Sequence, residues 1–319
     1  MTIKHLVISG GGQTLVQYIS LLHYLDEHQY LSMQNIESIY GTSAGVLVGC
    51  MVSMKFDWNT IEDFVILRPW HDIFKLQLDK VFDAYRDRGL YGRKQLEKMF
   101  KPLLDATDLS LNVTLQEFYD FTHKEMHFIT FEVNEFQTVD ISYLTHPDLS
   151  LLEAVQMSCG LPIIVTPVIK DNKCYMDGGM TCNYPLKYCL SSGKPVEEIL
   201  GIRNKYETAN FMNGITTRIV HEKSNLLEYV LHILFKLIAL LRDREATTST
   251  PSIPHEVHVD AMEMTFETLR QFVFQMDVRK ELYKSGQETG RLFLESLQQQ
   301  QQQQTPKEPC LEIAPSLPL

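Results

Sequence analysis

Residues 36–45, Ile-Glu-Ser-Ile-Tyr-Gly-Thr-Ser-Ala-Gly, decide the fold. The run Ile36–Tyr40 predicts a short buried strand, and the apolar stretch Val46–Met54 predicts a buried helix. Between them, Gly41-Thr42-Ser43-Ala44-Gly45 has the pattern G-x-S-x-G, typical of a tight strand-to-helix turn that exposes a nucleophilic serine. Side chains at Gly41 and Gly45 would collide in such a turn. The pattern alone arises by chance in about one chain of this length in ten, so a packed turn without chemistry is the alternative.

A glycine-rich loop precedes this segment. Leu6-Val7-Ile8 predicts a buried strand, the loop Ser9-Gly10-Gly11-Gly12-Gln13 follows it, and Leu15–Glu27 has the apolar spacing of a helix. Backbone N–H groups of such a loop can bind a phosphate or an oxyanion. A dinucleotide site would need glycine at position 15 and an acidic residue at the end of the second strand, where Leu15 and Tyr40 stand. The order strand, helix, strand, helix predicts a parallel sheet covered on both faces.

A third glycine-flanked segment lies far downstream. Asp177-Gly178-Gly179 follows the predicted strand Lys173–Met176. A carboxylate followed by two glycines can approach another backbone closely, although a simple Asp-Gly turn explains the same residues.

The remaining pattern predicts further helices and strands. Helices are expected at Trp58–Leu67, Arg93–Leu104, Leu115–Phe121 and Leu151–Cys159, and strands at His127–Val133, Val139–Tyr143, Val165–Ile169 and Ile199–Arg203, the last strand of the chain. Residues 225–297 are expected to be mostly helical, with a polar interruption over residues 246–254. The glutamine run and proline-containing tail, residues 298–319, cannot form a packed core and are expected to be disordered.

Together the three glycine-containing motifs resemble the patatin-like phospholipases, lipid acyl hydrolases with a Ser-Asp dyad. The family has a glycine-rich loop after its first strand, then G-x-S-x-G, then D-G-G or D-G-A. The resemblance covers residues 4–203. Flanking segments support it: Gly89–Tyr91, Ser158–Pro162, Thr166–Val168 and Asn183–Pro185.

The resemblance implies both a fold and a set of roles. The fold would be a three-layer α/β domain with a central, mostly parallel sheet. The sequence pattern beyond the resemblance adds a helical C-terminal extension over residues 220–297, so we expect one domain over residues 1–297. Ser43 would attack an ester carbonyl, Asp177 would act as general base, and an oxyanion hole would come from the N–H groups of Gly11, Gly12 and Gln13. Gly10, Gly41, Gly45, Gly178 and Gly179 would shape the motifs. The substrate would be a lipid ester, with contact to a membrane or lipid droplet, and no metal or organic cofactor is implied.

One departure from the family pattern concerns the glycine loop. The family usually reads G-G-G-x-R/K-G, whereas this chain has Thr14 and Leu15 at the last two positions. Backbone donors need no side chain, so an oxyanion hole is still expected. The missing cation removes one means of binding a lipid phosphate.

Two other functions fit parts of the sequence. An α/β-hydrolase would use a Ser-His-Asp triad, but Ser43 follows only two predicted strands, which is too early for that fold. The histidines after Asp177 lie in no recognisable motif (His221, His232, His255 and His258), and His255-Glu256-Val257-His258 has the wrong spacing for a zinc helix and is expected to be a solvated surface stretch. A non-catalytic lipid- or protein-binding protein that keeps the fold is the alternative from another class.

Composition excludes further classes. The net charge of −11 argues against nucleic acid, which binds clustered lysine and arginine. The six cysteines form no CxxC pair, so reduced thiols in a cytosol-like compartment are expected. Residues 1–5 lead directly into a strand, so we expect no secretory signal.

The segment Leu226–Leu241 is strongly amphipathic. It has 13 apolar residues among 16, and its polar residues Glu228, His232 and Lys236 recur every fourth position. It is too short and too charged to span a bilayer. It is either a core helix with one solvated edge, or a lid or interfacial surface beside the active site.

Overall fold

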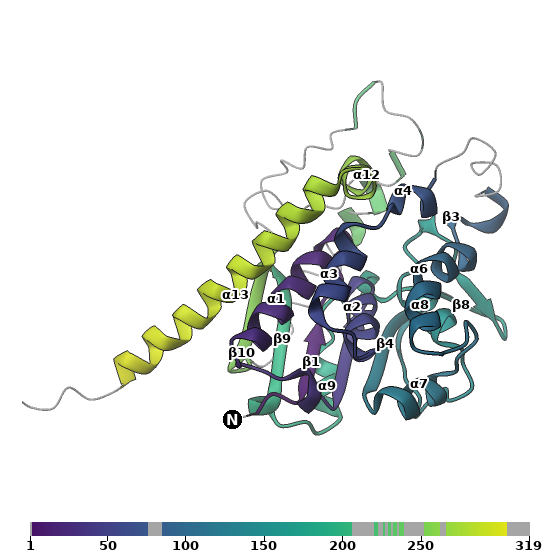
Figure 1. The fold of residues 1–319 in the computed structure, drawn as a ribbon. Coiled ribbons are helices and arrows are strands. Elements are labelled where there is room, and N and C mark those ends of the chain that lie inside the picture. The colour runs from purple at the N-terminus through teal and green to yellow at the C-terminus, as the bar shows by residue number, and fades with distance from the viewer. Residues whose placement is uncertain are drawn as a thin grey trace, which may run out of the picture.

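A mixed sheet forms the centre of the computed structural model (Figure 1), which describes residues 2–75, 85–205, 220–222, 252–261 and 266–304, with further residues between 226 and 238. The sheet follows the order β10-β9-β1-β2-β4-β8-β7, and β5 pairs with β4 outside this path. Five neighbouring strands are parallel, from β10 to β4, whereas β5, β7 and β8 pair in antiparallel fashion. The strands are β1 (His5–Ile8), β2 (Ser38–Thr42), β4 (Glu125–Glu132), β5 (Gln137–Ile141), β7 (Val168–Lys170), β8 (Lys173–Asp177), β9 (Ile199–Lys205) and β10 (His255–Asp260).

Helices cover the sheet on both faces, as the sequence predicted. Leu6 and Ile8 of β1 belong to the larger core, which includes residues of the helices α1, α2, α3 and α13, whereas Val7 belongs to a smaller core with α9. This alternation follows from the two-residue period of a strand. The helices are α1 (Leu15–Glu27), α2 (Ala44–Ser53), α3 (Trp58–Ile66), α4 (Trp70–Ile73), α6 (Arg93–Ala106), α7 (Leu115–Thr122), α8 (Leu151–Ser158), α9 (Leu186–Ser191), α12 (Phe266–Phe274) and α13 (Met276–Gln304).

The long helix α13 packs along α1 and then runs past the body of the molecule (Figure 1). Gly286 and Gly290 lie on its contact face, four residues apart. A Cβ atom on Gly286 would lie 2.0 Å from Ser20 Oγ and 2.2 Å from the carbonyl oxygen of Gln17. Glycine at this position therefore allows the two helices to approach closely.

Most predicted elements are confirmed within two residues at each end, and four differ. The segment expected to be helical after residue 225 contains the strand β10. The predicted strand Ile199–Arg203, which is β9, is therefore not the last strand among the described residues. His255–His258, expected to be a surface stretch, belongs to this strand, and Val257 is buried. The expected strand Val165–Ile169 is divided into β6 (Ile163–Val165) and β7, and β6 pairs with β3 (Gly89–Tyr91) outside the main sheet.

The fourth difference concerns the glutamine run. The helix α13 continues to Gln304, so residues 298–304 are helical and not disordered, whereas residues 305–319 lie outside the described part of the chain. The run continues an amphipathic helix that is already formed, and glutamine has a good helix propensity. The polar interruption expected over residues 246–254 also lies outside the described residues, except for its last three positions.

Candidate active site

The register of β4 explains how distant motifs come together. Residues 128–132 pair with β5 along one edge of β4. Along the other edge, β2 pairs with residues 125–129 and the antiparallel strand β8 with residues 130–132. The strands β2 and β8 therefore run toward each other on one edge, and their carboxyl ends meet beside Ile129 and Thr130. Ser43, which follows β2, is thus placed next to Asp177, the last residue of β8.

Ser43 occupies a strained turn between β2 and α2. Its φ of 51° and ψ of −115° lie outside the backbone regions that non-glycine residues favour. A Cβ atom on Gly41 would lie 2.7 Å from the Val46 nitrogen, and one on Gly45 would lie 2.2 Å from the carbonyl oxygen of Ile8. Gly41 is therefore required by the turn itself, while Gly45 is required by close packing of α2 against β1.

The serine hydroxyl and the aspartate carboxylate are in direct contact. Ser43 Oγ donates to Asp177 Oδ2 at 2.6 Å. The other carboxylate oxygen, Oδ1, accepts the Gly179 N–H at 2.7 Å, which fixes the side chain in this orientation. Asp177 is 6% exposed, so little water competes for the hydroxyl. The hydroxyl thus has a carboxylate acceptor at the distance of a strong, charge-assisted hydrogen bond.

Ser158 and Cys159, at the end of α8, hold the backbone of Ser43. Ser158 Oγ accepts the Ser43 N–H at 3.0 Å and donates to the carbonyl oxygen of Ile129 at 2.6 Å. The Cys159 thiol donates to the carbonyl oxygen of Ser43 at 3.4 Å. Burial and the nearby Asp177 carboxylate raise the pKa of the Cys159 thiol well above its ordinary value, so the thiol stays protonated. The sequence pattern marked this segment but predicted no role for Ser158.

The glycine loop lies beside Ser43. A Cβ atom on Gly10 would lie 3.2 Å from Ser43 Cβ, and the Gly10 N–H donates to the carbonyl oxygen of Asn183 at 3.0 Å. Gly12 has a φ of 54°, in the left-handed region that glycine tolerates. Within the described residues, the N–H groups of Gly11 and Gly12 have no protein acceptor. Because backbone donors are normally paired, these two half-buried N–H groups are available to an anion.

The side chains around this loop carry no cation at the position where the family usually has one. Thr14 is buried, and Leu15 begins α1. Gln13 is buried as well, and its side-chain amide donates to Thr268 Oγ1 of α12 at 3.3 Å. The C-terminal part of the chain therefore packs directly against the glycine loop.

The histidines on β10 have other partners. His255 Nδ1 lies 2.6 Å from the Tyr30 hydroxyl, and His258 forms an ion pair with Glu256. The strand β10 is separated from β2 by β9 and β1. Among the residues that the structure describes, no group of three or more histidine, cysteine or acidic side chains could hold a metal ion.

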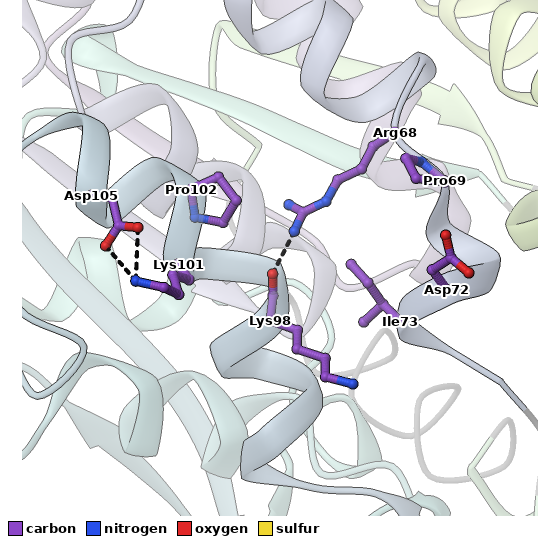
Figure 2. Close-up of a pocket in the computed structure, with 8 residues that line it drawn as sticks. All are labelled: Arg68, Pro69, Asp72, Ile73, Lys98, Lys101, Pro102 and Asp105. Atoms are coloured by element: carbon purple, nitrogen blue, oxygen red, sulfur yellow. Dashed lines mark hydrogen bonds and ion pairs between the residues drawn. The ribbon is translucent and has the colours of Figure 1, made fainter.

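A groove of about 570 Å³ lies between the residues around α4 and those of α6 (Figure 2). Its cationic groups are largely engaged. The Arg68 guanidinium donates to the carbonyl oxygens of Lys98 and Met99, and Lys101 pairs with Asp105. The groove contains none of the motif residues. Its lining residues are Arg68, Pro69, Asp72, Ile73, Lys98, Lys101, Pro102 and Asp105.

Comparison with known families agrees with this arrangement. The family model for patatin-like phospholipases matches residues 6–190, more than half of the chain. The chain belongs to the patatin-like phospholipase family. The matched residues run from β1 through both the serine and the aspartate motifs to α9. The family predicted from the three motifs is thereby confirmed.

Named relatives and one solved structure extend the comparison. "Probable lipid hydrolase 463L" of Invertebrate iridescent virus 6 is 25% identical over 189 residues, which cover 59% of this chain and 63% of the relative. "Uncharacterized protein R571" of Acanthamoeba polyphaga mimivirus is 26% identical over 185 residues, which cover 58% and 60%. The chain thus matches about three fifths of each relative's length. VipD from Legionella pneumophila has the same fold, with a TM-score of 0.54 at 14% identity over 93% of this chain and 67% of VipD.

Proposed function

We propose that this patatin-like protein hydrolyses acyl esters of lipids, with Ser43 as nucleophile and Asp177 as general base. The observation that carries the proposal is the 2.6 Å hydrogen bond from Ser43 Oγ to Asp177 Oδ2 at a strained turn. Lipid as the substrate class rests on the family and on a relative described as a probable lipid hydrolase.

The proposed reaction has two halves. Ser43 Oγ attacks the ester carbonyl carbon while its proton passes to Asp177, and the oxyanion is held by the N–H groups of Gly11, Gly12 and Gln13. The carbonyl re-forms, the bond to the leaving alkoxide breaks, and Asp177 returns the proton to it. Water then attacks the acyl-enzyme, gives a proton to Asp177 and releases the fatty acid as Ser43 recovers its hydrogen.

Asp177 needs help to act as a base toward a serine. An ordinary aspartate has a pKa of about 3.9, far below that of a hydroxyl, so proton transfer alone is unfavourable. Direct contact with Ser43 and a preorganised oxyanion hole lower the free energy of the tetrahedral intermediate. The loop beside Ser43, with acceptor-free N–H groups at Gly11 and Gly12 within the described residues, supports this part of the proposal.

We further propose that the helix around residues 226–238 contacts the lipid surface. Where it is described, this segment is helical, and its exposed side chains are apolar: Leu226, Tyr229, Val230, Ile233 and Leu237. Leu226 is 77% exposed, while His232 and Lys236 are partly buried. These two polar residues therefore do not form the solvated edge that a core helix would have. Glu228 lies outside the described residues. No helix in the described residues is long and apolar enough to cross a membrane. An in-plane helix with an outward apolar face is suited to a membrane interface.

A fluorophosphonate probe tests the catalytic part of the proposal, because it reacts with the hydroxyl of an activated serine and forms a stable phosphonyl ester. We expect the wild-type protein to be labelled and Ser43→Ala to remain unlabelled at the same melting temperature. Labelling that persists in Ser43→Ala would place the reactive group elsewhere. Absence of labelling in the wild-type protein would favour the non-catalytic binding protein.

A further inference from the structure

The carbonyl oxygen of Gly10 is surrounded by three buried side chains. Asn204 Nδ2 donates to it at 2.7 Å, Asn183 Nδ2 donates at 3.1 Å, and the Tyr18 hydroxyl lies at 3.4 Å. Asn204 is 8% exposed and Asn183 is 9% exposed. A buried carbonyl oxygen normally needs only one hydrogen-bond donor, and this one has two side-chain amide donors. The Gly10 peptide group is therefore held in a defined orientation.

The register of β9 accounts for the place of Asn204. The strands β1 and β9 are parallel, and Ile8 is level with Ile202. The residues two positions further along each strand, Gly10 and Asn204, are therefore neighbours. Asn204 lies beyond residue 190, where the family match ends, so the family comparison assigns it no role.

Tyr18 determines which way the Asn204 amide points. The Tyr18 hydroxyl donates to Asn204 Oδ1 through a short hydrogen bond. Because Oδ1 accepts this proton, the amide nitrogen faces Gly10. Tyr18 is fully buried on α1, so the Asn204 amide is held from one side by α1 while it donates to the loop on the other.

Fixing the Gly10 carbonyl also fixes the next N–H group. The Gly10–Gly11 peptide is planar and trans, so its C=O and N–H point in opposite directions. With the carbonyl held by Asn183 and Asn204, the Gly11 N–H must face away from them. That N–H has no protein acceptor within the described residues, and the loop lies against Ser43.

We propose that Asn204, oriented by Tyr18, is a positioning residue for the oxyanion hole. It holds the Gly10–Gly11 peptide so that the Gly11 N–H is directed toward the developing oxyanion. The inference rests on the proposed function for its catalytic consequence, but the orientation of the loop can be measured independently. A misaligned oxyanion donor stabilises the transition state less but leaves binding of the ground-state substrate largely unchanged. Misalignment of the Gly11 N–H should therefore lower kcat and not the affinity for substrate.

The test compares Asn204→Ala with a matched control, Asn134→Ala. Asn134 Nδ2 makes the same kind of bond, to the carbonyl oxygen of Asn172 at 2.8 Å, away from the glycine loop. On a soluble nitrophenyl ester, we expect Asn204→Ala to lower kcat about tenfold or more with KM within about twofold, since small misplacements carry large rate costs. Asn134→Ala should match the wild-type protein.

Amide hydrogen exchange of residues 9–14 measures the loop itself. We expect faster exchange of Ser9 and Gly10, whose N–H groups bond to Ile202 and Asn183, in Asn204→Ala and not in Asn134→Ala. Tyr18→Phe keeps the ring and removes only the hydroxyl, so it should lower kcat in the same direction. If Asn204→Ala strongly lowers the melting temperature, the kcat of Tyr18→Phe is used to test the inference.

The outcomes separate two failures. An inactive and unlabelled wild-type protein would overturn the proposed function, while the exchange experiment would still decide whether Asn204 orders the loop. Unchanged loop exchange in Asn204→Ala overturns the inference. So does an active protein in which kcat is unchanged in both Asn204→Ala and Tyr18→Phe.

Discussion

At the scale of single residues, Gly45 shows how closely α2 packs against β1. The Gly45→Ala substitution places a methyl group 2.2 Å from the carbonyl oxygen of Ile8, and a backbone atom in a central strand cannot move aside. We expect a loss of about 1–3 kcal/mol in the free energy of unfolding, typical of overpacking, and a lower melting temperature. Gly92→Ala is the control, because its nearest contact is the Thr166 side chain at 3.3 Å. Equal melting temperatures for the two variants would contradict this account of Gly45.

The amino-acid sequence predicts a site residue where the adjacent residues form a recognisable motif. Ser43 and Asp177 each lie in a glycine-flanked turn after a strand, and that local pattern is visible in the amino-acid sequence alone. Ser158 and Asn204 carry no such mark. A buried serine or asparagine is typical of any packed strand or helix end. The register of β9 with β1 places Asn204 beside Gly10, and the packing of α8 against Ile129 of β4 places Ser158 beside Ser43.

At the scale of helices and strands, the contact between α1 and α13 depends on Gly286. Replacing glycine by alanine in a helix interior gains about 1 kcal/mol from helix propensity. Here the new methyl group would lie 2.2 Å from the Gln17 carbonyl oxygen, and overpacking of about 1–3 kcal/mol opposes that gain. We therefore expect Gly286→Ala to lower the melting temperature, whereas Lys284→Ala on the exposed side of α13 should not. A higher melting temperature for Gly286→Ala would show that the helices can separate without loss.

The apolar helix around residues 226–238 has a separate prediction. Ile233 and Leu237 are exposed, so the double substitution by glutamate should leave the melting temperature unchanged. If this face enters a membrane, each lost apolar side chain removes about 1.5–3 kcal/mol of binding. Hydrolysis of vesicle lipid should then fall while hydrolysis of a soluble ester is unaffected.

The matched control for that experiment replaces Phe136 and Leu144, which are also exposed, by glutamate. This control should retain both activities. Joint loss of both activities and of stability in the Ile233 and Leu237 variant would show that the face is core. Equal vesicle activity in the two variants would contradict membrane contact.

The strand β10 was missed although its pattern has the period of a strand. Val257 and Val259 are buried while His258 and Asp260 are exposed. Apart from the two valines, its side chains are histidines and acids, as suits an edge strand exposed on one side. Short edge strands give a weak signal, and the helical pattern on either side dominated the prediction.

At the scale of the whole molecule, we expect a pH-dependent contribution to stability from a partly buried charge cluster on β4 and β5. His127 Nδ1 lies 2.8 Å from Asp140 Oδ2, Nε2 lies 3.3 Å from Glu125 Oε1, and the ring stacks on Tyr40. Burial alone would lower the pKa of His127, but the contacts with Asp140 and Glu125 outweigh it and raise the pKa above 6.5. The His127 contact lowers the pKa of Glu125 to about 2, so this partner stays ionised.

The sign of the pH dependence follows from the raised pKa. The folded protein binds the His127 proton more tightly than the unfolded chain does, so the stabilisation is complete below pH 6.5 and is lost as pH rises through the folded pKa. We expect the contribution of His127 to the melting temperature of the wild-type protein to fall as pH rises above 6.5. His127→Gln should abolish this part of the pH dependence. Parallel curves for the two proteins would show that His127 is neutral in the fold.

The central claim is that Ser43 and Asp177 form a catalytic dyad, and the most direct test is the turnover of Asp177→Asn on a soluble ester. Asparagine keeps the shape of the side chain but cannot accept the serine proton, so we expect kcat to fall by a factor of about 10³ or more at an unchanged melting temperature. Asp171→Asn, in an exposed turn, should retain full turnover. An Asp177→Asn protein that retains most of its kcat would contradict the dyad.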